Sequence, residues 1–144
     1  MQNQISIFGS QGRIVIEVLG YENPSAKNED DANWLATSLR VEAGPFSGSF
    51  RLAFTTHDLT TLLDQIQNAL GALTGTVSFQ NLEDDVSLNI RFDSRGGATV
   101  SGAAHPHLSQ GVALHFQFDS DQSILRNTAR ELEATLRRFP VISV

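Results

Sequence analysis

The four histidines are the side chains best suited to hold a metal ion, because the chain contains no cysteine. His105 and His107 are two residues apart, which would point them the same way on a strand, and His115 follows eight residues later. Pro106 interrupts a strand, however, and no third ligand stands at a fixed spacing, so loop histidines without an ion are the favoured interpretation. His57 follows two threonines at an expected helix start, where a first-turn position is favoured over a general base. We therefore predict no metal and no cofactor.

The acidic residues gather in two short runs within expected loops: Glu29, Asp30, Asp31 and Glu83, Asp84, Asp85. Calcium-binding loops alternate their acids and often include glycine, and neither run does so. Two interpretations remain. The acids are either solvated loop residues, which is the simpler interpretation, or a negatively charged patch that binds a basic protein.

Trp34 is the only tryptophan of the chain. If Leu35, Leu39 and Val41 face the core of a strand, Trp34 points outward, where a tryptophan would anchor an interface. A bulge would instead turn it inward, and core packing is slightly favoured. We take Trp34 and the six acids of the two runs as the candidate partner-binding residues.

No catalytic motif is present in the chain. There is no nucleophile elbow, phosphate loop or dinucleotide fingerprint, and no pair of carboxylates stands out, so we assign no catalytic residue and expect no enzyme. The net charge is −6, and the ten basic residues are scattered, which disfavours a nucleic acid as partner.

Composition and length predict a globular chain with a single domain over residues 1–144. Apolar residues are 40% and charged residues 18% of the 144, which is too apolar for a disordered chain. The first eight residues lack the positive charge and apolar run of a secretory signal. No apolar stretch approaches the ~18 residues that cross a bilayer, so we expect a cytoplasmic protein without a membrane contact.

Alternation of apolar and polar residues predicts most of the secondary structure. Four clear strands are expected near residues 14–19, 50–54, 85–93 and 112–118, and weaker ones at 5–8, 34–41, 76–79 and 98–104. Helical spacing replaces this alternation at 59–70 and 124–136. Thr55 and Asp58 resemble a capping box before the first helix, and Asp119 and Ser120 are candidate N-caps of the second.

This order predicts an α+β fold. We expect about eight mostly antiparallel strands in a strongly curved or two-layer sheet, with two amphipathic helices packed on it in the order ββββαββββα. Strands that come in consecutive runs disfavour a parallel βαβ arrangement.

The segments 15–24, VIEVLGYENP, and 30–35, DDANWL, resemble the WapI-like immunity proteins of bacterial polymorphic-toxin systems and neighbouring uncharacterised bacterial families. A strand that feeds a helix over 55–63, and a final helix that ends in Phe139 and Pro140, extend the similarity along most of the chain. The most specific segment of the resemblance is 31–35, DANWL.

The resemblance implies a small cytoplasmic protein that binds and neutralises a cognate toxin and brings no catalytic residues with it. It also implies structural roles for the shared residues Tyr21, Asp31, Asn33 and Trp34, since toxin-contacting surfaces vary among immunity proteins. An acidic inhibitor would suit the basic face of a nuclease toxin.

Two alternatives without enzymatic activity remain from the residues alone. The first is a curved sheet that binds a small molecule between its aromatic strand residues, although such residues are more often core. Those residues are Phe50, Phe54, Phe79, Phe92, Phe116 and Phe118. The second is a structural unit in which the outer sheet face, with Trp34, pairs with a second copy to form a homodimer.

Overall fold

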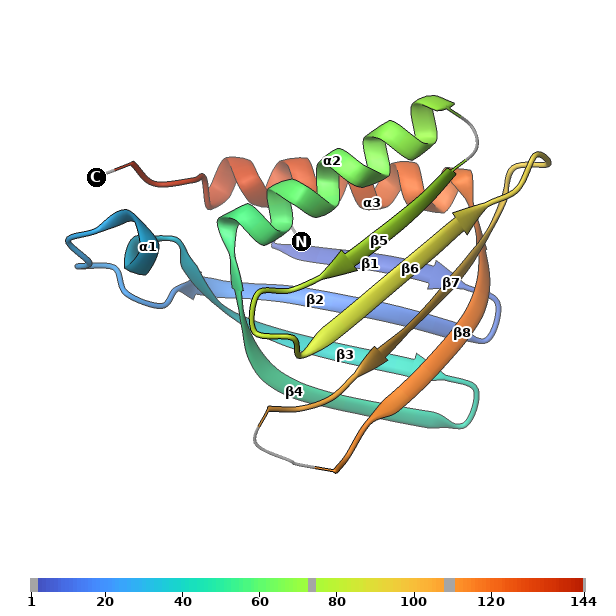
Figure 1. Cartoon of the computed structure of the whole chain (residues 1–144), viewed down its shortest axis with the longest axis horizontal. Helices are drawn as coiled ribbons and strands as arrows, with labels where there is room; N and C mark the ends of the chain where they lie inside the picture. Colours follow the sequence, from blue (N-terminus) through green and yellow to red (C-terminus); the bar gives the residue numbers. More distant parts are fainter. Residues whose placement is uncertain (1–2, 73–74, 108–110, 144) are drawn as a thin grey trace.

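The chain forms two four-stranded antiparallel sheets and three helices over residues 3–72, 75–107 and 111–143, which a computed structural model describes (Figure 1). The first sheet contains β1 (Gln4–Gly9), β2 (Gly12–Tyr21), β3 (Trp34–Ala43) and β4 (Phe46–Thr55). The second contains β5 (Gly75–Gln80), β6 (Val86–Phe92), β7 (Gly97–Ala104) and β8 (Leu114–Asp121). In each sheet, neighbours in sequence are neighbours in space. The helices are α1 (Glu29–Ala32), α2 (Thr56–Ala72) and α3 (Gln122–Arg138).

The predicted α+β class, the antiparallel pairing and the element order are confirmed, with three differences in detail. The short helix α1 lies within what the sequence indicated only as a polar loop. The strand β8 begins after Val112, which is 57% exposed rather than buried. The same strand continues to Asp121, so Asp119 and Ser120 pair with β7 and are not N-caps.

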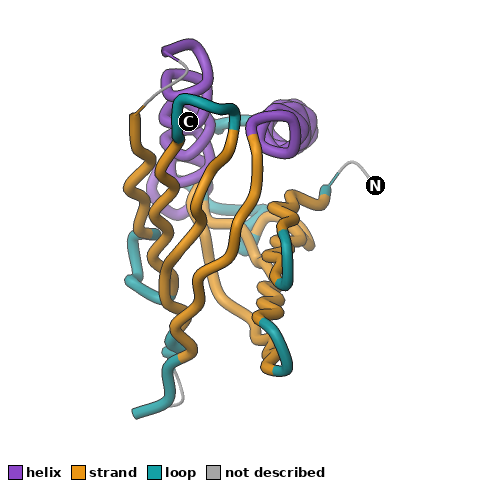
Figure 2. Tube along the Cα trace, turned by 90° about the vertical axis from the view of Figure 1, so that its right-hand side faces the viewer, coloured by secondary structure: helices purple, strands orange, loops and turns teal. Residues whose placement is uncertain are grey.

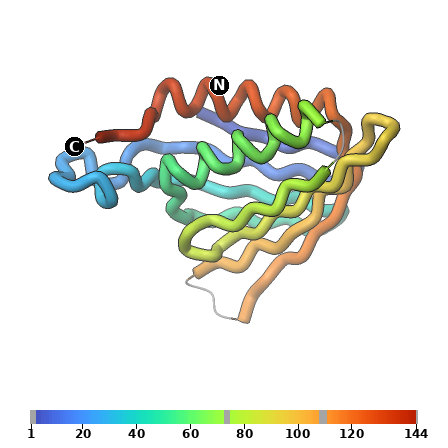
Figure 3. Tube along the Cα trace, turned by 45° about the horizontal axis from the view of Figure 1, so that its top comes forward, coloured from blue at the N-terminus to red at the C-terminus, as the bar shows by residue number. Residues whose placement is uncertain are grey.

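The two sheets pack face to face with their strands crossing at a large angle (Figures 1 and 2). The helices α2 and α3 lie beside one another along one side of this pair, as Figure 3 shows. Helix α3 packs along β1 and helix α2 along β5, so each helix covers one edge of one sheet. Half-buried strands thus bury their inner faces against the opposite sheet and the helices, as the alternation requires.

The inner faces of both sheets and the buried faces of the helices share one apolar core. Phe54 of β4 and Phe79 of β5 stack across the sheets with ring centroids 6.3 Å apart. Five of the six phenylalanines named above are buried, and Phe50 packs against them. These aromatic residues are therefore core residues, which argues against a pocket between the strands.

Helix side chains hydrogen-bond to the edge strands that they cover. The Oε1 atom of Glu131 accepts from the backbone N–H of Ser6 in β1, at 2.9 Å, and from its hydroxyl at 2.8 Å. On the other sheet, Gln65 Oε1 accepts from the backbone N–H of Ser78 in β5, at 2.9 Å. On each sheet, an edge-strand N–H that no neighbouring strand could pair with thereby has an acceptor. These bonds also fix the position of each helix along the strand that it covers.

Both long helices begin with a side-chain cap. The predicted capping box is confirmed, because Thr55 Oγ1 accepts from the Asp58 N–H and Asp58 Oδ2 accepts from the Thr55 N–H, both at 2.9 Å. Asp121 caps α3 by accepting from the Ile124 N–H. Hydrogen bonds from the Ser123 hydroxyl and the Ile124 N–H hold the pKa of Asp121 below its usual range.

A glycine allows the two sheets to meet at the β1–β2 turn. The Ser10 N–H donates to the Asp119 carbonyl at 2.8 Å, which joins the turn to β8. A Cβ atom on Gly9 would clash with that same carbonyl oxygen and with the Phe118 ring. Since a backbone atom cannot swing aside as a side chain can, the turn or β8 would have to move.

We expect Gly9→Ala to lower the free energy of unfolding by about 2 kcal/mol, the usual cost of overpacking. Urea denaturation would measure it. Gly48→Ala in β4 is the matched control, because a Cβ there meets nothing within 4 Å. Equal stabilities of the two variants would show that the seam at Gly9 tolerates a methyl group.

Candidate functional site

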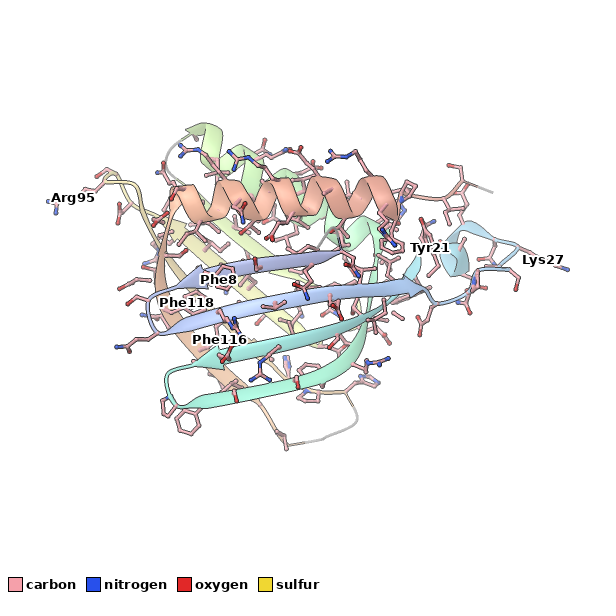
Figure 4. All side chains as sticks on the ribbon, turned by 180° about the vertical axis from the view of Figure 1, so that it is seen from behind. Phe8, Tyr21, Lys27, Arg95, Phe116 and Phe118 are labelled. Atoms are coloured by element: carbon pink, nitrogen blue, oxygen red, sulfur yellow. The ribbon has the colours of Figure 1, made fainter. Side chains whose placement is uncertain are left out.

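Half of the sixteen acidic residues gather at one end of the molecule, where the β2–β3 connection, the first turn of α2 and the β5–β6 loop meet. Figure 4 shows Tyr21 and Lys27 at this end and Arg95 at the opposite end. The Leu82 N–H of the β5–β6 loop donates to Asp58 Oδ2 of α2 at 3.4 Å, which ties two of the three segments together. We call this region the acidic end, and its carboxylates are Glu22, Glu29, Asp30, Asp31, Asp58, Glu83, Asp84 and Asp85.

A depression of about 510 Å³ lies at the centre of the acidic end. Its acidic wall comes from Glu29 and Asp30 of α1, and its apolar wall comes from Trp34 of β3 and Leu82 of the β5–β6 loop. His57 lines it as well, as an exposed residue of the first turn of α2. The structure thus brings Trp34 together with two acids of the first predicted run, Glu29 and Asp30, while Glu83 and Asp85 of the second run lie outside this depression. We call it the Trp34 depression.

Trp34 lies outside the core. Its neighbour Leu35 is fully buried, and since side chains alternate along β3, Trp34 faces the outer side and is partly exposed. The inward orientation, which the sequence slightly favoured, is therefore wrong, because the register shift in this sheet falls in β2 and not in β3. Leu82 beside it is 68% exposed. Large apolar side chains surrounded by acids are typical of a contact surface.

Asn33 holds the segments around the depression together, and its side chain is only 2% exposed. Its Nδ2 group donates to the carbonyls of Glu29, at 2.8 Å, and Ile142, at 2.9 Å. Its Oδ1 atom accepts from the Thr56 hydroxyl, at 2.7 Å, and from the Ile142 N–H, at 2.8 Å. One amide therefore joins α1, the start of α2 and the C-terminal segment, with all four of its hydrogen-bonding positions used.

Asp31 is engaged within its own helix. Asn28 is the N-cap of α1, and its Oδ1 atom accepts from the Asp31 N–H at 2.9 Å. The Asn28 Nδ2 group in turn donates to the Asp31 carboxylate at 3.0 Å. Asp31 thus has a local structural contact, as the resemblance implied, while its neighbours Glu29 and Asp30 line the depression.

The C-terminal segment is anchored at the same end by Tyr21. The Tyr21 hydroxyl donates to the Pro140 carbonyl at 2.7 Å, and its ring meets the Phe139 ring edge to face at 5.6 Å. Burial raises the pKa of Tyr21, which keeps the hydroxyl a donor. The resemblance to the WapI-like proteins at Phe139 and Pro140 thus has a structural explanation, since both residues contact Tyr21.

The three acids of the β5–β6 loop differ in their surroundings. Glu83 and Asp84 are exposed, with Asp84 at a φ of 60° and its carboxylate accepting from Gln80 Nε2. Asp85 is 3% exposed, so the interpretation as solvated loop acids is wrong for this residue. Asn81 organises the loop, because its Oδ1 atom accepts from the backbone N–H groups of Asp85 and Val86.

The remaining histidines lie apart from the Trp34 depression. His115 is exposed on the outer face of β8, and His107 is exposed beside Asp85. Within residues 3–72, 75–107 and 111–143, no group of three or more histidine or acidic side chains is arranged to hold a metal ion. In the same part of the chain, no helix has the length and apolar character that a membrane crossing requires.

The structure defines the class of this protein, and comparison with known proteins identifies its family. The fold and the site define an α+β protein with two crossed four-stranded meanders, two covering helices and an acidic end that contains a partly exposed tryptophan. The model of the WapI-like immunity protein family matches residues 5–140, so the chain belongs to that family.

Two further comparisons concern sequence and fold separately. No curated protein matches the chain. Among solved structures, the chain is similar to that of the plant transcriptional regulator PBF-2, with a TM-score of 0.53, 9% sequence identity, and coverage of 97% of this chain and 89% of that one. At this identity the likeness concerns the fold alone.

Proposed function

We propose that this chain is an immunity protein that binds a cognate bacterial toxin domain through the acidic end and neutralises it without catalysing a reaction. The family membership supports binding of a toxin. The contact residues that we propose are Glu29, Asp30, Asp31, Trp34, Glu83, Asp84 and Asp85. The protein acts in the cytoplasm, where it meets the toxin.

The observation that carries this proposal is the Trp34 depression. Partly exposed Trp34 and 68% exposed Leu82 offer an apolar centre, and Glu29 and Asp30 surround it with negative charge. Interfaces commonly have this plan, with an aromatic anchor inside a polar rim. A toxin that acts on nucleic acid needs a basic surface, and an acidic inhibitor covers such a surface and associates with it quickly.

The direct test is complex formation with a cognate C-terminal toxin domain, for which we would search the gene immediately upstream of this chain's gene. The two proteins are expressed together, purified, and examined by size exclusion with light scattering, which also reports whether the free chain is a homodimer. A stable complex, with loss of toxicity in cells, is the expected result. Absence of a complex at micromolar concentrations would overturn the proposal.

Charge at the acidic end should control the rate of association. We expect the double substitution Asp30→Asn with Glu83→Gln to slow association with the toxin about tenfold at low ionic strength, with a smaller difference at high salt. Stopped-flow fluorescence or surface plasmon resonance would measure the rates.

The matched control removes two charges elsewhere. Asp64 of α2 and Asp119 of β8 are not among the carboxylates of the acidic end and do not line the Trp34 depression, and Asp64→Asn with Asp119→Asn changes the net charge by the same amount. Should both double variants slow association equally, net charge and not the acidic end would attract the toxin.

A further inference from the structure

The Asp85 carboxylate is buried and lacks a strong partner. Its side chain is 4% exposed, and no hydrogen bond reaches the Oδ1 atom. The Oδ2 atom receives only a long contact of 3.4 Å from Asn81 Nδ2. The nearest base is His107, whose Nδ1 atom lies 3.9 Å from Asp85 Oδ1, beyond hydrogen-bond distance. Buried carboxylates are normally paired or fully hydrogen-bonded, so this one requires an explanation.

The loop around Asp85 does not need the carboxylate for its own structure. Asn81 Oδ1 already accepts from the backbone N–H groups of Asp85, at 2.8 Å, and Val86, at 3.0 Å. The Asp85 carbonyl accepts from the His105 N–H at 2.9 Å, which fixes the start of the next loop. These bonds use backbone atoms of Asp85 and Val86 and not the Asp85 carboxylate, so an uncharged side chain of the same shape would preserve them.

Asp85 lines a second depression of the acidic end, with a volume of about 350 Å³. Glu22 and Glu83 add two more carboxylates to its wall, against one arginine, Arg51, and His107. The His107 side chain is 68% exposed and stands next to the unpaired oxygen. The depression is therefore negatively charged, and the exposed His107 side chain forms part of its wall. We call it the Asp85 depression.

We propose that the Asp85 depression binds a cationic side chain of the protein partner, an arginine guanidinium in preference to a lysine ammonium. This inference rests on the proposed function. The guanidinium displaces His107 and donates to Asp85 Oδ1, and the carboxylates of Glu83 and Glu22 take its remaining N–H groups. A planar group with five donors suits several carboxylates better than a compact ammonium does. Charge-assisted bonds to a desolvated carboxylate are the strong ones at an interface.

The competing explanation is a partner within the chain. Arg51 lies on the outer side of β4, opposite Ser38, and His107 is already close to Asp85. Either side chain could turn to Asp85 and fill the site. Within the described residues neither makes a hydrogen bond to Asp85 Oδ1, so the experiment must distinguish an external cation from these two.

The first experiment titrates the free protein with N-acetyl-arginine amide and follows the amide signals of Asp85, Val86 and His105 by NMR. We expect saturable shifts in the millimolar range, weaker shifts with N-acetyl-lysine amide, and none with the neutral isostere N-acetyl-citrulline amide. In Asp85→Asn the affinity should fall at least tenfold. Shifts that are absent, or equal in Asp85→Asn and the parent protein, overturn the proposal, as do shifts that appear only in Arg51→Ala.

The second experiment uses the toxin domain. We expect Asp85→Asn to weaken the complex at least tenfold and Glu83→Gln about threefold, while Asp119→Asn in β8, opposite Thr99 near the start of β7, leaves it unchanged. Glu83 is exposed, so its variant tests the site even if Asp85→Asn fails to fold. Unchanged affinity in both variants overturns the proposal. If the parent protein binds no toxin, the proposed function fails, while the titration alone still decides whether the depression binds a cation.

Discussion

Replacing Asn33 by alanine is expected to lower the free energy of unfolding by about 3 to 4 kcal/mol, because four hydrogen bonds of a buried amide are lost together. The substitution also leaves the Thr56 hydroxyl without its acceptor in a fully buried position. Buried polar groups without partners cost more than the net value of the bonds themselves. The effect should therefore exceed that of most polar-to-alanine substitutions.

Urea denaturation followed by circular dichroism measures this loss. Asn23→Ala is the matched control, since Asn23 is exposed and the bond that its side chain donates to the Asp31 carbonyl is 3.3 Å long. We expect the control to change stability by less than about 0.5 kcal/mol. A loss below 1 kcal/mol for Asn33→Ala would mean that water replaces its bonds and that Asn33 does not join the three segments.

The second large effect concerns the partner. If the Trp34 depression is the centre of the interface, Trp34→Ala should weaken binding of the toxin domain at least thirtyfold, which corresponds to about 2 kcal/mol. A tryptophan at the centre of an interface buries a large apolar area, and its removal also lets water reach the surrounding charges. Isothermal titration calorimetry would measure the affinity.

Phe46→Ala is the matched control for Trp34→Ala. Phe46 is 67% exposed and pairs with Ala43, while Trp34 pairs with Thr55 at the other end of β3. Trp34 and Ala43 are nine positions apart along β3, which is about 30 Å. Strong weakening by Phe46→Ala together with normal binding by Trp34→Ala would place the interface at the opposite end of the sheet.

The fold was predictable because its determinants are local. Alternation over 86–92 or 50–54 needs only one strand with one buried face, and the capping box of Thr55 and Asp58 lies within four residues. The predicted bounds were wrong where hydrogen bonds to a neighbouring strand set the end of an element. β8 extends past Ser120 because β7 continues to offer hydrogen bonds as far as Gly97, which moves the cap to Asp121.

The candidate site was predictable only in part. The acidic runs and Trp34 are visible in the sequence, but their position at one end of the molecule depends on how the β5–β6 loop packs against α2. The roles of Asn33 and Asp85 depend on partners far along the chain, such as Ile142 for Asn33. The only sequence signal for Asn33 was its place in the segment 31–35, and Asp85 gave none beyond its charge.

The helices α3 and α2 cover the edge strands β1 and β5, and the β1–β2 turn bonds to the edge strand β8 at Asp119. The remaining edge strand is β4, where an incoming strand could join the first sheet. Two copies that pair through β4 would form one continuous eight-stranded sheet, and α3 would cover the edge strand β1 at each end of it. Because both of its edge strands are covered, such a sheet would not add a third copy. This arrangement limits the open-ended aggregation to which exposed β-edges are prone.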